Sequence, residues 1–131
     1  MIVVDTSAIL RALVGRPPNP ELSSRLGEEE LHAPHLIDAE LVHALRRLVL
    51  AADLTEDRAS DARSDFAELA MVRYPHQPLS DRMWELRHNL SAYDAAFVAL
   101  SEALEAPLVT CDRRLASAPG HGASIELFDR S

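Results

Sequence analysis

The chain has no lysine, one cysteine and no long apolar stretch. All 13 of its basic residues are arginines. Because Cys111 is the only cysteine, an internal disulfide and a zinc-finger type of site are excluded, and we expect Cys111 to be a small core residue. No apolar run approaches the ~20 residues that span a bilayer, and because neither a basic segment nor a cleavage signal follows Met1, we expect no signal peptide. We therefore predict a cytoplasmic protein with no membrane partner.

The acidic balance of the chain does not exclude a nucleic acid partner. The formal net charge is −8, whereas phosphate contacts usually need positive charge. Acids that bind divalent cations would be largely neutralised, however, and arginine is the better bidentate ligand for phosphate. The length of 131 residues and a hydrophobic content of 47% fit a single globular domain over residues 1–131.

Short apolar runs alternate with helical patterns along the chain. We predict strands at 1–4, 31–33, 108–111 and 125–128, a further strand at 71–74, and helices at about 6–14, 19–27, 36–52, 55–70, 80–87 and 92–104. This alternation predicts an α/β fold: a three-layer α/β/α sandwich around a central parallel sheet of four or five strands.

Two aspartates directly follow predicted buried strands. Asp5 closes the run Met1-Ile2-Val3-Val4, and Asp112 closes Leu108-Val109-Thr110-Cys111. If these strands are neighbours at a topological switch point, the two carboxylates lie side by side, where ligands of open parallel sheets bind. Asp5 could instead simply cap the next helix, although Thr6 and Ser7 are able to cap it.

Glu40 and Asp94 lie near the starts of two predicted helices. Each has an ordinary structural explanation. A carboxylate such as Glu40 near a helix N-terminus interacts favourably with the helix dipole, and Ser91 to Asp94 forms a capping signature. Asp38 is better explained as a helix cap than as a ligand. Four gathered carboxylates would repel one another, so a divalent cation is the natural counter-charge. Oxygen ligands alone favour Mg²⁺, for which Mn²⁺ could substitute, over zinc.

Several other functional classes lack their motifs. The chain has neither a glycine-rich dinucleotide fingerprint nor a phosphate-binding loop ending in Gly-Lys. A phospho-aspartate receiver would need a lysine, and a haloacid-dehalogenase phosphatase would need an aspartate at the position of Ser7. Hydrolysis of a phosphodiester by metal-activated water is the simplest chemistry for four clustered acids.

With these residues identified, the chain resembles the PIN-domain nucleases, and more narrowly the VapC toxins of bacterial toxin-antitoxin pairs. The similarity extends over essentially the whole chain. It is carried by the segments Ile2 to Ala8, Pro34 to Glu40, Leu90 to Leu100 and Leu108 to Leu115, in this order and at these spacings.

The resemblance implies a role for each motif residue. The metal-binding and catalytic acids would be Asp5, Glu40, Asp94 and Asp112, supported by Thr6, Ser7 and Thr110. Arg87, Asn89 and Tyr93 would contact RNA, although Arg87 could equally pair with a surface acid and Tyr93 could simply pack. Some family members carry another acid after the fourth one, whereas this chain has Arg113 and Arg114, so the number of metal ions stays open.

The resemblance also implies an activity and partners. It predicts a Mg²⁺-dependent endoribonuclease, the toxin of a VapBC-type module, with an RNA substrate, a cognate VapB-like antitoxin and a homodimeric assembly. One alternative is a non-catalytic PIN-like protein that binds RNA or serves as a scaffold, for which missing acids would be the sign. Another is an RNA-maturation nuclease without an antitoxin.

Overall fold

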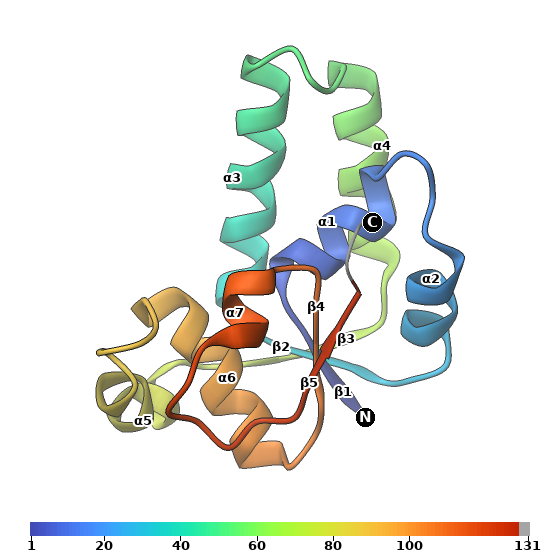
Figure 1. Ribbon diagram of the computed structural model, residues 1–131. Coiled ribbons are helices and arrows are strands. Elements are labelled where there is room, and N and C mark those ends of the chain that lie inside the picture. Colours follow the sequence, from blue (N-terminus) through green and yellow to red (C-terminus); the bar gives the residue numbers. More distant parts are fainter. Residues whose placement is uncertain (129–131) are drawn as a thin grey trace.

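The structure is a computed structural model that describes residues 1–128 (Figure 1). Its elements follow one another as β1 (Ile2–Val4), α1 (Thr6–Val14), α2 (Pro20–Gly27), β2 (Leu31–Pro34), α3 (Leu36–Leu50), α4 (Glu56–Glu68), β3 (Met71–Tyr74), a 3₁₀ turn (Gln77–Leu79), α5 (Ser80–Glu85), α6 (Ala92–Leu104), β4 (Leu108–Thr110), α7 (Arg113–Ser117) and β5 (Ile125–Leu127). The last three residues of the predicted domain, 129–131, lie outside the described part.

The five strands form one parallel sheet in the order β3-β2-β1-β4-β5. Val3 is in register with His32 of β2 and with Leu108 of β4, so β1 is the central strand. The predicted parallel sheet is confirmed with five strands, including the candidate strand at 71–74. The strands that precede Asp5 and Asp112 are neighbours, as the topological argument required.

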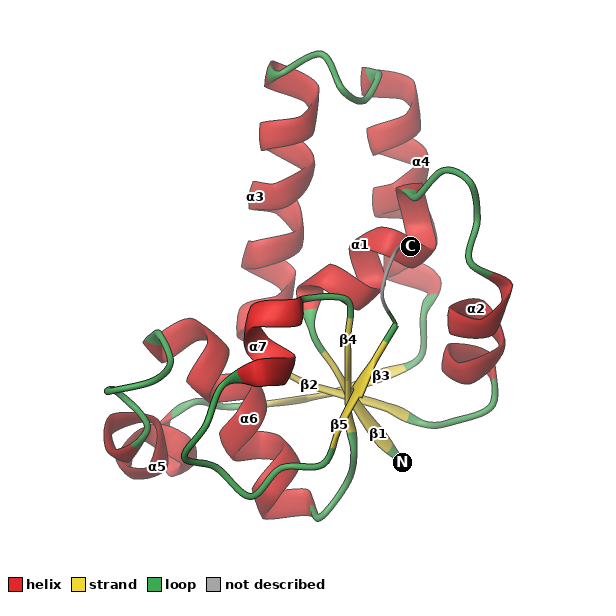
Figure 2. Cartoon of the chain, in the orientation of Figure 1, coloured by secondary structure: helices red, strands yellow, loops and turns green. Residues whose placement is uncertain are grey.

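Helices cover both faces of the sheet and give the predicted α/β/α sandwich. Helix α6 packs over β1, β2 and β4, whereas α1 packs with α3 and α4 on the other face. Figures 1 and 2 show α3 and α4 as an antiparallel pair that extends well beyond the sheet. Within residues 1–128, none of the helices combines the length and apolar character that crossing a bilayer requires.

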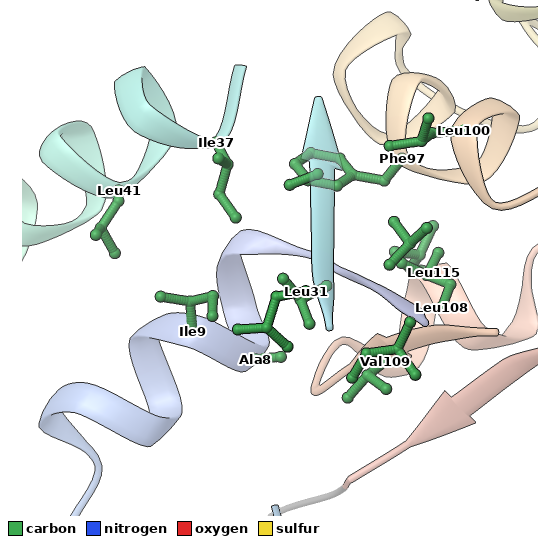
Figure 3. Packing of buried hydrophobic residues seen from close by; sticks show 14 of the residues in the cluster. Ala8, Ile9, Leu31, Ile37, Leu41, Phe97, Leu100, Leu108, Val109 and Leu115 are labelled. Carbon is green, nitrogen blue, oxygen red and sulfur yellow. The ribbon is translucent and has the colours of Figure 1, made fainter. Parts of the chain in front are cut away.

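The core lies where these layers meet at the central strands. Figure 3 shows Phe97 and Leu100 of α6 together with Ile9 of α1 and Ile37 of α3 around the sheet. Every residue from Ala95 to Ser101 is buried, because small alanines let α6 approach the strands closely. Helix α6, which carries Asp94 at its first turn, is therefore rigidly seated on the sheet.

Several predicted helix starts are confirmed. Asn19, Thr55 and Ser91 cap α2, α4 and α6, and each side chain accepts a hydrogen bond from a backbone N–H of the first turn. Thr6 and Ser7 do not cap α1, however. The helix begins at Thr6, and the carboxylate of Asp5 is itself the cap. A residue at the junction of strand and helix has the extended backbone that an N-cap needs.

The prediction that Asp38 caps a helix is wrong. Helix α3 begins after His35 without a side-chain cap, and Asp38 lies in its first turn. Its carboxylate accepts two hydrogen bonds from the guanidinium of Arg73, at 2.7 and 2.9 Å. Cys111 also differs from its prediction, because β4 ends at Thr110 and the thiol is only half-buried against the core.

Candidate metal centre

A cleft of about 650 Å³ opens at the carboxyl ends of β1 and β4. Its walls come from α1, α3 and α6, and all four predicted acids line it together with Thr6 and Ser7. The remaining lining residues are Leu10, Leu36, Ala39, His43, Ala44, Tyr93 and Phe97. The cleft therefore combines an acidic group of side chains with a largely apolar wall.

Asp5 lies deepest among the acids, with 6% of its surface exposed. Its Oδ1 accepts hydrogen bonds from the Ser7 hydroxyl at 2.7 Å and from the Ala8 N–H at 2.9 Å. Its Oδ2 accepts one from the Thr110 hydroxyl at 2.5 Å. The carboxylate is thus held by hydroxyl and backbone donors, and none of these donors carries a charge.

The charge of Asp5 is poorly compensated in this position. Burial raises the pKa of Asp5 to about 6, and the neighbouring negative charge of Asp112 adds to the rise. The hydrogen bonds from Thr110, Ala8 and Ser7 lower the pKa only in part. A buried carboxylate without a cationic partner is an unfavourable arrangement that a bound cation would relieve.

Thr110 and Ser7 link the ends of the two central strands. Their hydroxyl oxygens lie 3.2 Å apart. The Ser7 hydroxyl accepts the N–H of Cys111 at 2.9 Å, and the Thr110 hydroxyl accepts the N–H of Asp112 at 3.0 Å. This network fixes the backbone that carries Asp5 relative to the backbone that carries Asp112, across a sequence separation of 105 residues between Asp5 and Thr110.

Asp112 and Asp94 complete one side of the cleft. Asp112 caps α7 through the N–H groups of Arg114 and Leu115, at 2.9 and 3.4 Å from its Oδ1. Burial raises the pKa of Asp94, and the charge of Asp112 raises it further. The guanidinium of Arg114 opposes this rise, but its NH2 group is 3.9 Å from the Asp112 carboxylate and the side chain is 89% exposed.

Glu40 reaches the cleft from the second turn of α3. Its Oε1 accepts a hydrogen bond from the Thr6 hydroxyl at 2.6 Å. Thr6 is the first residue of α1, so this contact joins the start of that helix to α3. The predicted supporting residues Thr6, Ser7 and Thr110 thus each contact one of the acids or its backbone.

The donor chemistry of the cleft fits a hard divalent cation. Carboxylate and hydroxyl oxygens are the ligands that Mg²⁺ and Mn²⁺ prefer, and the lining contains no thiolate. In the described part of the chain, no three His, Cys, Asp or Glu side chains are grouped tightly enough to hold an ion as they stand. The hydroxyls of Thr6 and Thr110 hold Glu40 and Asp5, two of the four acids.

The three predicted RNA-contacting residues fall in different places. Tyr93 lines the cleft and is 62% exposed. Arg87 lies outside the lining, with its guanidinium 4.4 Å from the centre of the Trp84 ring. Asn89 is also outside the lining. Its side-chain amide packs closely against Gly120, where a Cβ atom would lie only 2.6 Å from Nδ2. His43 also lines the cleft and was not among the predicted site residues, although it follows Glu40 by three residues and so shares its face of α3.

Comparisons with known proteins agree with this architecture. The profile of the PIN domain matches residues 2–120. Ribonuclease VapC1 of Mycobacterium tuberculosis is 46% identical over 127 residues, which cover 95% of this chain and 96% of the relative. Ribonuclease VapC9 of the same species is 47% identical over 115 residues, 88% of each chain.

A solved structure has the same fold at low sequence identity. The crystal structure of VapBC2 from Rickettsia felis, bound to a DNA fragment from its promoter, superposes with a TM-score of 0.69. The match covers 98% of this chain and 100% of that chain, with 15% sequence identity. The matched profile and the close relatives, together with a parallel sheet that brings four acids to one cleft, show that this chain belongs to the PIN-domain family.

Proposed function

We propose that this chain is a divalent-metal-dependent endoribonuclease and acts as the toxin of a VapBC-type toxin-antitoxin module. The observation that carries the proposal is the presence of Asp5, Glu40, Asp94 and Asp112 in one cleft at the carboxyl edge of the sheet. A scaffold protein has no need for a group of acids in which burial raises the pKa values of Asp5 and Asp94. Relatives with 46% and 47% identity are named ribonucleases, which supports the same activity here.

The four acids would hold the cation, with Mg²⁺ as our first choice and Mn²⁺ as a substitute. When bound, such a cation activates a water molecule for attack on phosphorus and stabilises negative charge on the phosphate oxygens. Asp5 would be the anchoring ligand, because Thr110 and Ser7 fix its carboxylate. Glu40 and Asp94 would approach from α3 and α6, the two walls of the cleft.

The remaining predicted residues would bind the substrate outside the acidic group. The exposed ring of Tyr93 offers a surface on which an unstacked RNA base can stack. Arg87 already lies against Trp84, so this pair would act as a stacking platform at a distance from the acids. We propose only a supporting role for Asn89, whose side chain packs against Gly120.

We further propose a VapB-like antitoxin as the partner and a homodimer as the assembly, both working in the cytoplasm. The superposition with VapBC2 of Rickettsia felis, a toxin-antitoxin complex by its name, supports the antitoxin. An antitoxin could block the cleft by inserting an arginine, which pairs bidentately with carboxylates and competes with the cation. The competing function is RNA maturation without an antitoxin.

Purified protein incubated with RNA tests the chemistry. RNA should be cut in Mg²⁺ and in Mn²⁺, and EDTA should abolish cutting. Mapping the new RNA ends would identify the substrate and the bond. Cleavage that EDTA leaves undiminished would refute the metal mechanism, and a folded protein that cuts no RNA with either ion would favour the non-catalytic alternative.

Expression in the native host tests the toxin assignment. Induction should arrest growth, and co-expression of the gene immediately upstream should restore it. The same induction with Asp94→Asn is the matched control, since growth arrest should then disappear while the protein still accumulates. Unimpaired growth with verified wild-type protein would count against the toxin and in favour of the maturation nuclease.

A further inference from the structure

The cleft contains almost no group that could attract a phosphate. Its polar lining side chains are acids and hydroxyls, with one exception, and the chain carries a net charge of −8. The exception is His43, the only one of the described lining residues with a side-chain nitrogen. Imidazole carries at least one N–H donor in either protonation state, so His43 can bind an anionic oxygen.

In the described part of the chain, no arginine lines the cleft, and several arginines are engaged elsewhere. Five of them contact a described partner away from the cleft: Arg25 with Glu126 and Glu29, Arg58 with the Val14 carbonyl, Arg73 with Asp38, Arg82 with Glu102, and Arg87 with Trp84. Arg114 lies beside Asp112 but is 89% exposed. Arg46 and Arg47 follow His43 on α3 but do not line the cleft. Among the described lining residues, a phosphate would therefore find a side-chain nitrogen only at His43.

His43 lies next to the four acids of the cleft but is not one of the residues proposed to bind the metal. Three residues separate it from Glu40, which is a rise of about 4.5 Å along α3 on the same face. Thr6 holds Glu40 by a hydrogen bond, whereas no described residue hydrogen-bonds to the exposed ring of His43. The imidazole is thus free to meet a ligand that also reaches the acids.

The apolar wall next to His43 suits the rest of a nucleotide. Leu10 of α1, Leu36 of α3 and Phe97 of α6 line the same cleft, and Tyr93 adds an exposed ring. An unpaired base can lie against such a wall, whereas a base stacked inside a duplex cannot. The cleft therefore has one acidic part, one apolar part and a single nitrogen donor.

We propose that His43 is an RNA-binding residue that holds the phosphate next to the one being cut. The inference rests on the proposed ribonuclease function and adds a residue to the same cleft. The imidazole N–H would fix the position of an unpaired nucleotide, so that the neighbouring phosphate faces Asp5, Glu40 and Asp94. His43 would take no part in the metal coordination or in the proton transfers.

Three variants test this role. His43→Ala removes the donor, His43→Gln keeps an N–H donor of similar reach, and Arg63→Ala is the control. Arg63 is exposed on α4 and does not line the cleft, so this control removes a full positive charge elsewhere. His43 and Arg63 are both exposed helix positions, and melting temperatures close to the wild-type value would verify that the three variants fold.

Kinetics with a randomised single-stranded RNA pool gives the first measurement. His43→Ala should raise KM about tenfold or more with kcat nearly unchanged, because a hydrogen bond to a charged group is lost. His43→Gln should recover most of this loss, and Arg63→Ala should stay within about twofold of wild type. The Mg²⁺ concentration for half-maximal rate should not move. A wild-type KM, a fall in kcat alone, or a shifted Mg²⁺ requirement would each overturn the proposal.

Binding separates this proposal from the ribonuclease assignment. The same RNA is titrated against wild type and His43→Ala in Ca²⁺, a hard cation that carboxylates also bind. The variant should bind about tenfold more weakly, because one hydrogen bond to a charged phosphate is lost. If wild type cuts no RNA but this difference persists, the ribonuclease assignment fails and His43 remains an RNA-binding residue. Equal binding by the two proteins overturns the role of His43 alone.

Discussion

The carboxylates of this protein occupy two opposite environments. Away from the cleft, Glu102 and Glu126 each accept two hydrogen bonds from one arginine, at 2.8 to 3.0 Å, and these contacts lower their pKa values. In the cleft, burial raises the pKa values of Asp5 and Asp94. Glu102 and Glu126 are neutralised by arginines of the same chain, whereas Asp5 is buried without a cationic partner.

The largest effect should come from removing one cleft charge. Asp94→Asn keeps the size of the side chain but removes a charged ligand, so Mg²⁺-dependent RNA cleavage should fall by about 100-fold or more. Asp38→Asn is the control, since Asp38 pairs with Arg73 outside the cleft and its loss should leave cleavage within a few-fold. Equal losses of cleavage in Asp94→Asn and Asp38→Asn would show that the acids inside the cleft matter no more for catalysis than an acid outside it. Cleavage rates of purified proteins, with circular dichroism to verify folding, provide the measurement.

The second effect is on the stability of the metal-free protein. Burial raises the pKa of Asp5 to about 6 in the folded chain, against 3.8 for an unperturbed aspartate. The unfolded chain therefore releases its proton first, and stability should fall as the pH rises from about 4 to 6. Asp5→Asn removes this contribution and should stabilise the metal-free protein at pH 7 by on the order of 2–3 kcal/mol. Urea unfolding in EDTA at pH 4.5 and pH 7 measures the free energy of unfolding of wild type and Asp5→Asn. If Asp5→Asn is no more stable than wild type at pH 7, the buried charge of Asp5 does not destabilise the metal-free protein.

A smaller effect should follow from the loss of one hydroxyl. Thr110→Val keeps the shape of the side chain but removes the donor to Asp5 Oδ2. At pH 7 the metal-free protein should lose about 1.5–3 kcal/mol, since a buried charge loses a hydrogen bond. The loss should shrink below pH 5, where Asp5 in the folded chain is protonated. Thermal unfolding at both pH values measures this dependence. An equal loss at each would mean that the Thr110 hydroxyl acts through the N–H of Asp112 and not through the charge of Asp5.

The smallest effect should come from the neutralised acids. Arg82→Ala removes the pair with Glu102 that joins α5 to α6, and should cost roughly 1 kcal/mol or less, because the arginine side chain is 39% exposed. RNA cleavage should not change, and the loss should become smaller in high salt. Urea unfolding at two salt concentrations is the measurement. A large loss of cleavage would mean that the α5 to α6 contact controls the position of Asp94.

The sequence predicted the part of the site that depends on strands. Asp5 and Asp112 could be placed together because each closes an apolar run, and parallel strands end at a common edge. The bond between Asp5 and Thr110 could not be predicted, since it depends on the relative positions of β1 and β4 at the level of single atoms. Asp38 was assigned wrongly because its partner Arg73 lies on β3, a contact that only the pairing of β2 with β3 creates.

His43 illustrates a different reason for a missed residue. Its spacing from Glu40 indicates that the two share a face of α3, but the sequence does not tell which face meets the cleft. That face is set by the packing of α3 against α1, through buried residues such as Ile37 and Leu41. A helix that is apolar on one side and mixed on the other leaves the position of an exposed histidine undetermined.

The strand order has a consequence for the protein while it is being made. The cleft needs Asp5 from the first strand to be synthesised and Thr110 from the fourth, and β4 pairs directly with β1. Until that late segment has left the ribosome, β1 has only one of its two neighbours and Asp5 lacks the hydroxyl that holds it. A growing chain therefore cannot assemble the acidic cleft before β4 has emerged and paired with β1.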